Sequence, residues 1–145
     1  NHGDEVTRTD VVAAIIIRDG RILLTQRRRG KALAYKWCTP GGTVDGAESH
    51  CTALARECSE EVNATIVAYP HSARFMVALD PPDVFAPMDV HYYYAPISAD
   101  SHEPRPMEGQ GFGWFTANDL ARLELTPADE ARREELVMLV RGANR

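Results

Sequence analysis

Apolar residues gather first in two short runs separated by a turn signal. Residues 11–17 read Val-Val-Ala-Ala-Ile-Ile-Ile, and a second apolar run lies within residues 21–26. Between them stands Asp19-Gly20, and both residue types tolerate the positive φ angles of a two-residue hairpin turn. The pattern predicts two strands joined by a tight turn. The first is expected to be buried on both faces, because every position in it is apolar.

Apolar residues then recur with the spacing of an α-helix, and this pattern predicts a helix over residues 47–62. The apolar positions that repeat with this period are Cys51, Leu54, Ala55, Cys58 and Val62. Asn63 stands just beyond, where a helix end favours a residue that accepts the left-handed conformation. We therefore expect the helix to end at Val62.

The rest of the chain alternates apolar runs with Pro- and Gly-rich turns. We predict strands over 65–68, 73–79, 90–95 and 114–115, an irregular turn over 80–88 and a long polar loop over 98–113. Thr116 is an N-cap signal for a short helix through Leu120, and Thr126-Pro127 is one for the final helix. Strands mixed with a few helices predict the α+β class, as a sandwich.

Composition narrows the class of protein without identifying it. A length of 145 residues predicts one domain over 1–145. The formal net charge of −5 disfavours non-specific nucleic-acid binding, although a local metal or Arg cluster can still attract a polyphosphate. There is neither a membrane-length apolar run nor a signal-peptide pattern. Cys38, Cys51 and Cys58 lack CxxC spacing, so reduced, buried thiols in a cytoplasmic protein are expected.

The candidate chemistry lies on the predicted helix. Glu57, Glu60 and Glu61 stand at i, i+3 and i+4, so their carboxylates share one face and repel each other. Mg²⁺ is a natural compensating ion, because it prefers oxygen ligands and commonly bridges carboxylates and phosphates. The alternative for three glutamates taken alone is a solvated acidic face.

The surrounding residues resemble a known motif, the Nudix box. Residues 42–48 read Gly-Thr-Val-Asp-Gly-Ala-Glu, seven residues intervene, and residues 56–64 read Arg-Glu-Cys-Ser-Glu-Glu-Val-Asn-Ala. The family pattern is a Gly, five residues, a Glu, seven residues, then Arg-Glu-aliphatic-any-Glu-Glu-any-Gly-aliphatic. Cys58, Asn63 and Ala64 depart from it with residues of similar physical role. Fixed gaps over such a length make the match specific.

The resemblance implies a fold, a cofactor and a set of site residues. The fold is the Nudix α/β/α sandwich, with a mixed β-sheet between helices, and the cofactor is Mg²⁺, with Mn²⁺ as a substitute. Glu57, Glu60 and Glu61 match the metal-binding catalytic carboxylates. Arg56 and Glu48 match the pair that completes the catalytic motif by holding its loop against the helix. Gly41 and Gly42 match the turn that places ligands, Gly41 on the metal side and Gly42 on the substrate side.

Residues outside the box extend the resemblance to MutT-like members of the family. Glu108 precedes the strand that carries Trp114 and is the candidate fourth metal carboxylate, with Glu103 as its competitor in the same loop. Arg27 aligns with an Arg that contacts phosphate in MutT-like enzymes. Arg suits this role because its guanidinium makes bidentate contacts to phosphate oxygens. The alternatives in the same basic loop are Arg28, Arg29 and Lys31.

The base-binding residues are less specific. Pro127-Ala128-Asp129 resembles an element that sets an acid against the base edge, although an Asp in the first turn of a helix is also favoured by the helix dipole. The strand aromatics are expected to be core rather than base-stacking residues; they are Phe75, Tyr92, Tyr93 and Tyr94. His71 and His91 are acid or base candidates that no spacing requires.

The functional prediction is a Mg²⁺-dependent hydrolase that cleaves a nucleoside triphosphate, ordinary, oxidised or modified, to a monophosphate and pyrophosphate. The alternative substrate is a diphosphate derivative such as ADP-ribose, or a dinucleoside polyphosphate. A non-catalytic ligand-binding module is the rival class, and the retained carboxylates argue against it. We expect a nucleotide as the small-molecule partner, neither nucleic acid nor membrane, and a monomer or homodimer.

Overall fold

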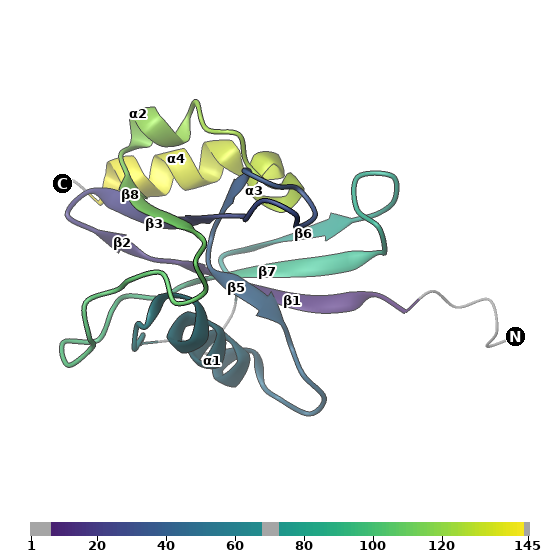
Figure 1. Ribbon diagram of the computed structural model, residues 1–145, viewed down its shortest axis with the longest axis horizontal. Helices are drawn as coiled ribbons and strands as arrows, with labels where there is room; N and C mark the ends of the chain where they lie inside the picture. The colour runs from purple at the N-terminus through teal and green to yellow at the C-terminus, as the bar shows by residue number, and fades with distance from the viewer. Residues whose placement is uncertain (1–6, 68–72, 144–145) are drawn as a thin grey trace, which may run out of the picture.

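The computed structural model describes residues 7–67 and 73–143, and Figure 1 shows their arrangement. The larger sheet has the strand order β5-β1-β7-β6. Its strands are β1 (Thr9–Ile15), β5 (Gly41–Thr43), β6 (Phe75–Leu79) and β7 (Met88–Tyr94). β1 and β7 are parallel, whereas β5 and β6 run antiparallel to their neighbours. The sheet is therefore mixed, as predicted.

A smaller antiparallel sheet adjoins it. It is built from β2 (Ile17–Arg18), β3 (Arg21–Gln26), β4 (Trp37–Cys38) and β8 (Gly111–Phe115). The prediction of a single strand over 11–17 is wrong in one respect. The apolar run leaves the larger sheet after Ile15 and enters the smaller one at Ile17. Asp19 and Gly20 have φ angles of 53° and 73°, which confirms the predicted hairpin turn.

Helices cover both sides of the sheets, which confirms the α/β/α sandwich. α1 (His50–Val62) lies on one side, and the other side carries α2 (Ala117–Leu120), α3 (Pro127–Ala131) and α4 (Arg133–Gly142) (Figure 1). In the described part of the chain, no helix is long and apolar enough to cross a membrane.

β1 is buried on both faces, as its composition predicted. Val12 and Ala14 pack in the core cluster on the α1 side, whereas Ala13 and Ile15 pack in the cluster that contains Leu136 of α4. Complete burial of a Val or Ile side chain, such as Val12 or Ile15, stabilises the fold by about 1.5–3 kcal/mol. This central strand therefore anchors the elements that carry the site.

α1 begins three residues later than predicted and ends where predicted. The Ser49 side chain accepts a hydrogen bond from the Thr52 backbone N–H and caps the helix. Asn63 has φ 58° and ψ 30°, the expected left-handed conformation. The predicted apolar stripe is shifted at one position, because Ala53 faces the core and Ala55 is exposed.

Other boundaries differ where tertiary contacts override local pattern. In place of the strand predicted over 65–68, Ile66 forms an isolated bridge with Ile97, and residue 68 lies outside the described residues. β8 begins at Gly111 rather than at 114 because it pairs with β3 along its whole length. The predicted turn over 80–88 is irregular as expected, ending at Met88 where β7 begins.

The two predicted N-caps have different outcomes. Thr116 and Asp119 form a reciprocal capping box at the start of α2. Thr126 makes no side-chain capping bond, and the single predicted final helix is broken at Arg132, whose φ is −116°. All three cysteines are free, but only Cys58 is fully buried.

Candidate active site on helix α1

Arg56 organises the acidic face of α1. Its Nη1 donates to Glu57 Oε1 at 2.8 Å and to Glu60 Oε1 at 3.0 Å. Its Nε and Nη2 donate to the two carboxylate oxygens of Glu48 at 2.7 and 2.9 Å. This bidentate arrangement fits the planar guanidinium and brings four of the predicted site residues together.

Glu48 ties the preceding loop to the helix. Its Oε1 also accepts a hydrogen bond from the Asp45 backbone N–H at 3.0 Å, and the Arg56 Nη2 reaches the Thr43 carbonyl oxygen at 3.1 Å. Hydrogen bonding to Arg56, aided by the Asp45 amide, lowers the pKa of Glu48 to about 2. Glu48 therefore remains ionised at neutral pH and acts here as a positioning group.

The two glycines of β5 allow carboxylates to lie against the sheet edge. The Gly41 backbone N–H donates to Glu61 Oε2 at 3.0 Å. A Cβ on Gly42 would lie 2.5–2.7 Å from the carboxylate atoms of Glu57, so any larger residue there would displace that carboxylate. The two glycines, which the resemblance matches to a ligand-placing turn, thus lie against carboxylates of the chain itself.

Glu61 occupies the most unusual electrostatic position of the three glutamates. Burial, reinforced by the negative charges of Glu57 and Glu108, raises its pKa to about 8, against the opposing hydrogen bond from Gly41. Carboxylates that interact in this way, Glu61 with Glu57 and with Glu108, suit a hard divalent cation, which offsets their repulsion and prefers oxygen ligands. The residues that would hold it are Glu57, Glu60, Glu61 and Glu108.

The raised pKa of Glu61 predicts a pH-dependent stability of the metal-free protein. The unfolded chain has the ordinary Glu pKa of 4.5. Between that value and about 8 the folded state binds more protons, so its stability should fall as pH rises through this window. Thermal unfolding in a chelator between pH 5 and pH 8.5 measures the slope. In Glu61→Gln the slope should flatten, and equal slopes in both proteins would contradict the assignment.

A loop crossing the end of α1 brings Glu108 to the same place. The Glu61 carbonyl oxygen accepts from the Met107 backbone N–H at 3.0 Å and from Gln110 Nε2 at 2.8 Å. Glu108 and Glu61 both line a cavity of about 540 Å³. Glu103, the competing candidate, instead forms an ion pair with Arg18 at 2.7 Å. The geometry favours Glu108 as the additional carboxylate.

Basic side chains line the same cavity. Arg27, Arg28 and Lys31 contribute to its wall, whereas Arg29 does not. The Arg27 Nε donates to the Ala32 carbonyl oxygen at 2.5 Å, which restrains the guanidinium. Acidic and basic groups thus face one space, the arrangement that a metal-bound polyphosphate requires.

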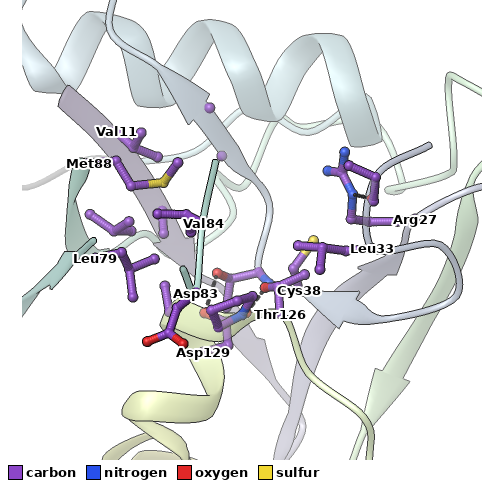
Figure 2. A pocket seen from close by; sticks show the side chains of 18 of the residues that line it. Val11, Arg27, Leu33, Cys38, Leu79, Asp83, Val84, Met88, Thr126 and Asp129 are labelled. Atoms are coloured by element: carbon purple, nitrogen blue, oxygen red, sulfur yellow. Dashed lines mark hydrogen bonds between the residues drawn. The ribbon is translucent and has the colours of Figure 1, made fainter. Parts of the chain in front are cut away.

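A second, more apolar cavity of about 740 Å³ adjoins the first (Figure 2). The two share the wall residues Arg27, Cys38, Thr39 and Gly41. Figure 2 shows Leu79, Val84 and Met88 at one side of this cavity and Arg27 at the other. A ligand with a flat apolar part and a charged tail can therefore occupy both spaces at once.

Asp129 lines the apolar cavity and is almost completely buried. Its Oδ2 accepts from the Thr39 backbone N–H at 2.6 Å, and its Oδ1 accepts from Thr39 Oγ1 at 3.1 Å and from the Tyr92 hydroxyl. Burial raises the pKa of Asp129, although these hydrogen bonds favour the charged form and oppose the shift. Asp129 is thus held rigidly in the wall of the cavity.

Sequence reasoning missed two members of this network. Thr39 belongs to no predicted motif, and Tyr92 is predicted only as a core residue. Tyr92 is fully buried, as expected, but its hydroxyl reaches Asp129 and its ring lines the cavity. The hydroxyl of a buried Tyr normally needs a partner, and that signal was available from the sequence.

Of the histidine candidates, His91 does not join this site. The His91 Nε2 lies 3.0 Å from Asp10 Oδ1, on another part of the sheet, and His71 lies outside the described residues. Tyr93 is also buried, whereas Tyr94 is partly exposed and Phe75 stacks against Tyr92 with ring centroids 4.8 Å apart. The acid or base role considered for His91 has no support in this geometry.

Comparisons with known proteins point consistently to one family. A family profile of the NUDIX domain matches residues 7–137. The chain is 35% identical to the CTP pyrophosphohydrolase of Escherichia coli, over 83% of this chain and 84% of that protein. It is 31% identical to the 8-oxo-dGTP diphosphatase of Haemophilus influenzae, over 81% and 84%. The crystal structure of a MutT NUDIX hydrolase from Burkholderia pseudomallei superposes with a TM-score of 0.74 at 32% identity, covering 88% of this chain and 97% of that one. The chain belongs to the Nudix hydrolase family.

Proposed function

We propose that this hydrolase cleaves a nucleoside triphosphate to a nucleoside monophosphate and pyrophosphate, with Mg²⁺ held by Glu57, Glu60, Glu61 and Glu108. The observation that carries the proposal is the pair of adjoining cavities, one apolar with a buried carboxylate and one lined by acidic and basic groups. A base and sugar fit the first cavity by size, because ligand pockets commonly measure about 300–1,000 Å³. The phosphate chain extends into the second.

Charge favours a triphosphate over a diphosphate derivative. Arg27, Arg28 and Lys31 bring three cations to the phosphate-side cavity, in addition to the metal. A triphosphate presents its negative charge along the whole chain beyond the sugar, whereas ADP-ribose continues into a second, uncharged sugar. The relatives described above are named for a triphosphate substrate, CTP in one case and 8-oxo-dGTP in the other.

The chemical roles follow from the positions of the side chains. A divalent ion, when bound, polarises phosphoryl oxygens and lowers the pKa of water. Arg27, Arg28 and Lys31 bind the phosphates and spread the charge that develops during displacement. Between Glu57 and Glu61, we assign the role of proton acceptor to Glu61. Glu57 is instead engaged by the Arg56 guanidinium at 2.8 Å.

The decisive experiment resolves pyrophosphate from phosphate in the products of a nucleotide panel with Mg²⁺. The panel contains the four ordinary triphosphates, 8-oxo-dGTP, a 5-modified pyrimidine triphosphate, ADP-ribose and a diadenosine polyphosphate. We expect one triphosphate to give a monophosphate and pyrophosphate at a kcat/KM at least tenfold above the other compounds. Turnover of a diphosphate derivative alone would overturn the triphosphate assignment, and turnover of none would favour a binding module.

The same panel tests Asp129 as the residue that reads the base. A buried carboxylate accepts hydrogen bonds from the amino group of cytosine or from the N–H groups of guanine. Asp129→Asn should therefore lower kcat/KM for the nucleotide with the preferred base about 10- to 100-fold. It should also reduce the differences in kcat/KM between nucleotides with different bases. Asp83→Asn, which changes an exposed carboxylate of the same cavity wall, is the matched control. An unchanged base ranking in Asp129→Asn would remove Asp129 from recognition.

A further inference from the structure

Asp10, His50 and His91 form a second cluster of ligand-type side chains, away from the glutamates. The His50 Nε2 lies 2.7 Å from Asp10 Oδ2, and the His91 Nε2 lies 3.0 Å from Asp10 Oδ1. One ligand atom from each residue lies within 4.8 Å of the other two. Both imidazoles thus direct their Nε2 atoms toward the Asp10 carboxylate.

Three separate elements supply these residues. Asp10 lies on β1, His91 on β7, and His50 is the first residue of α1. Asp10 stands two positions before Val12, on the β1 face that packs toward α1, and the parallel register pairs Val12 with His91. The cluster therefore sits on the α1 side of the larger sheet, just beyond the end of the apolar core.

Tyr93 fixes the orientation of one ring. Its hydroxyl lies 2.7 Å from the His50 Nδ1, and Tyr93 itself is largely buried. A metal-binding His commonly places its second ring nitrogen against such a partner, which orients the ring. The Tyr93 hydroxyl can accept from Nδ1–H when Nε2 acts as a ligand, and it can donate to Nδ1 when Nε2 carries the proton.

The Asp10 carboxylate contacts the two histidines, whereas the neighbouring Arg8 pairs with a different acid. Asp89, the partner of Asp10 in the β1–β7 register, is held by Arg8 at 2.9 Å. Asp10, His50 and His91 are about a quarter to a half exposed, so solvent and ions can reach them. With neutral rings the cluster carries one negative charge and attracts a cation.

We propose that Asp10, His50 and His91 bind a divalent transition-metal ion of the Zn²⁺ type, at a site distinct from the Mg²⁺ site. Two imidazole nitrogens and one carboxylate oxygen suit such an ion, whereas Mg²⁺ prefers an all-oxygen set. Neighbouring ligand atoms in a tetrahedral Zn²⁺ site are roughly 3.3 Å apart. The distances from the two His Nε2 atoms to the Asp10 carboxylate oxygens, 2.7 and 3.0 Å, are slightly shorter than this spacing. The three ligand atoms all lie within 4.8 Å of one another, so small shifts would bring them to it.

The bound ion would clamp β1, β7 and the start of α1 together. His50 and Glu57 are seven residues apart on α1, so their backbone positions are separated by roughly 10 Å along the helix axis. The clamp therefore fixes the helix that carries the catalytic carboxylates without sharing a ligand with them. The inference does not depend on which substrate the enzyme cleaves.

Titration of Zn²⁺ into the full chain in excess Mg²⁺, followed by calorimetry, tests the site. We expect one Zn²⁺ to bind, and His91→Gln and Asp10→Asn each to weaken binding about a hundredfold. Tyr93→Phe should weaken it about tenfold, because it removes only the partner of a ligand. Co²⁺ in place of Zn²⁺ should give visible absorption of a four-coordinate site, and His91→Gln should abolish it.

Two controls separate this site from the catalytic one. His102→Gln removes an exposed His outside the cluster, and Glu60→Gln alters the acidic face of α1; both should leave Zn²⁺ binding unchanged. Mg²⁺-dependent hydrolysis by His91→Gln and Asp10→Asn checks that these variants are folded. Failure of the wild-type chain to bind Zn²⁺ in excess Mg²⁺, or wild-type affinity in His91→Gln, would overturn the proposal.

Discussion

Replacing Glu60 by Gln should lower kcat/KM for nucleotide hydrolysis about a thousandfold. A metal ion contributes several kcal/mol of charge stabilisation in the transition state, and about 4 kcal/mol corresponds to three powers of ten. Glu60 is the most informative of the three glutamates to change. Its side chain is 52% exposed and the amide is isosteric, so lost activity cannot be attributed to a core defect.

Product release over a range of Mg²⁺ concentrations measures this effect. The Mg²⁺ concentration for half-maximal rate should rise together with the fall in kcat/KM. Glu134→Gln, an exposed carboxylate on α4 at the other side of the sheets, is the matched control and should retain full activity. Wild-type turnover by Glu60→Gln would show that the ion is not held as proposed.

Substitution by alanine should affect different properties at the two adjacent glycines of β5. A Cβ on Gly41 would lie 2.0 Å from the Val12 carbonyl oxygen, which belongs to the central strand. A Cβ on Gly42 would meet the far end of the Glu57 side chain. Neither glycine has a positive φ, so the added methyl group acts through contact alone.

Gly41→Ala should therefore cost stability, and Gly42→Ala should cost activity. The clash at Gly41 destabilises by about 3 kcal/mol or more, which lowers the midpoint of thermal unfolding by about 10 °C. At Gly42 the carboxylate of Glu57 moves aside, which should reduce kcat about a hundredfold at nearly unchanged unfolding temperature.

Thermal unfolding and steady-state rates on the two variants separate these outcomes. Gly142→Ala is the control, because nothing lies within 4 Å of the added Cβ. Full activity in Gly42→Ala would show that the position of Glu57 is not critical. An unchanged unfolding temperature in Gly41→Ala would mean that β1 and β5 can separate without loss.

Local sequence determined the features whose cause is local. The hairpin at Asp19-Gly20, the left-handed Asn63 and the capping box at Thr116 depend on residues adjacent in the chain, and all three are present. The spacing of Glu57, Glu60 and Glu61 placed their carboxylates on one helix face for the same reason. A fixed spacing within one helix fixes geometry before any tertiary contact forms.

Long-range packing decided what the sequence could not. The choice of Glu108 over Glu103 depends on the loop that bonds to the Glu61 carbonyl oxygen, and the setting of Asp129 depends on Thr39 and Tyr92. These partners lie far apart along the chain.

The same reason explains the split of the run over 11–17 between two sheets and the meeting of Asp10, His50 and His91. Strand pairing and burial are settled by segments that are remote in sequence, and no local pattern encodes which of them will meet.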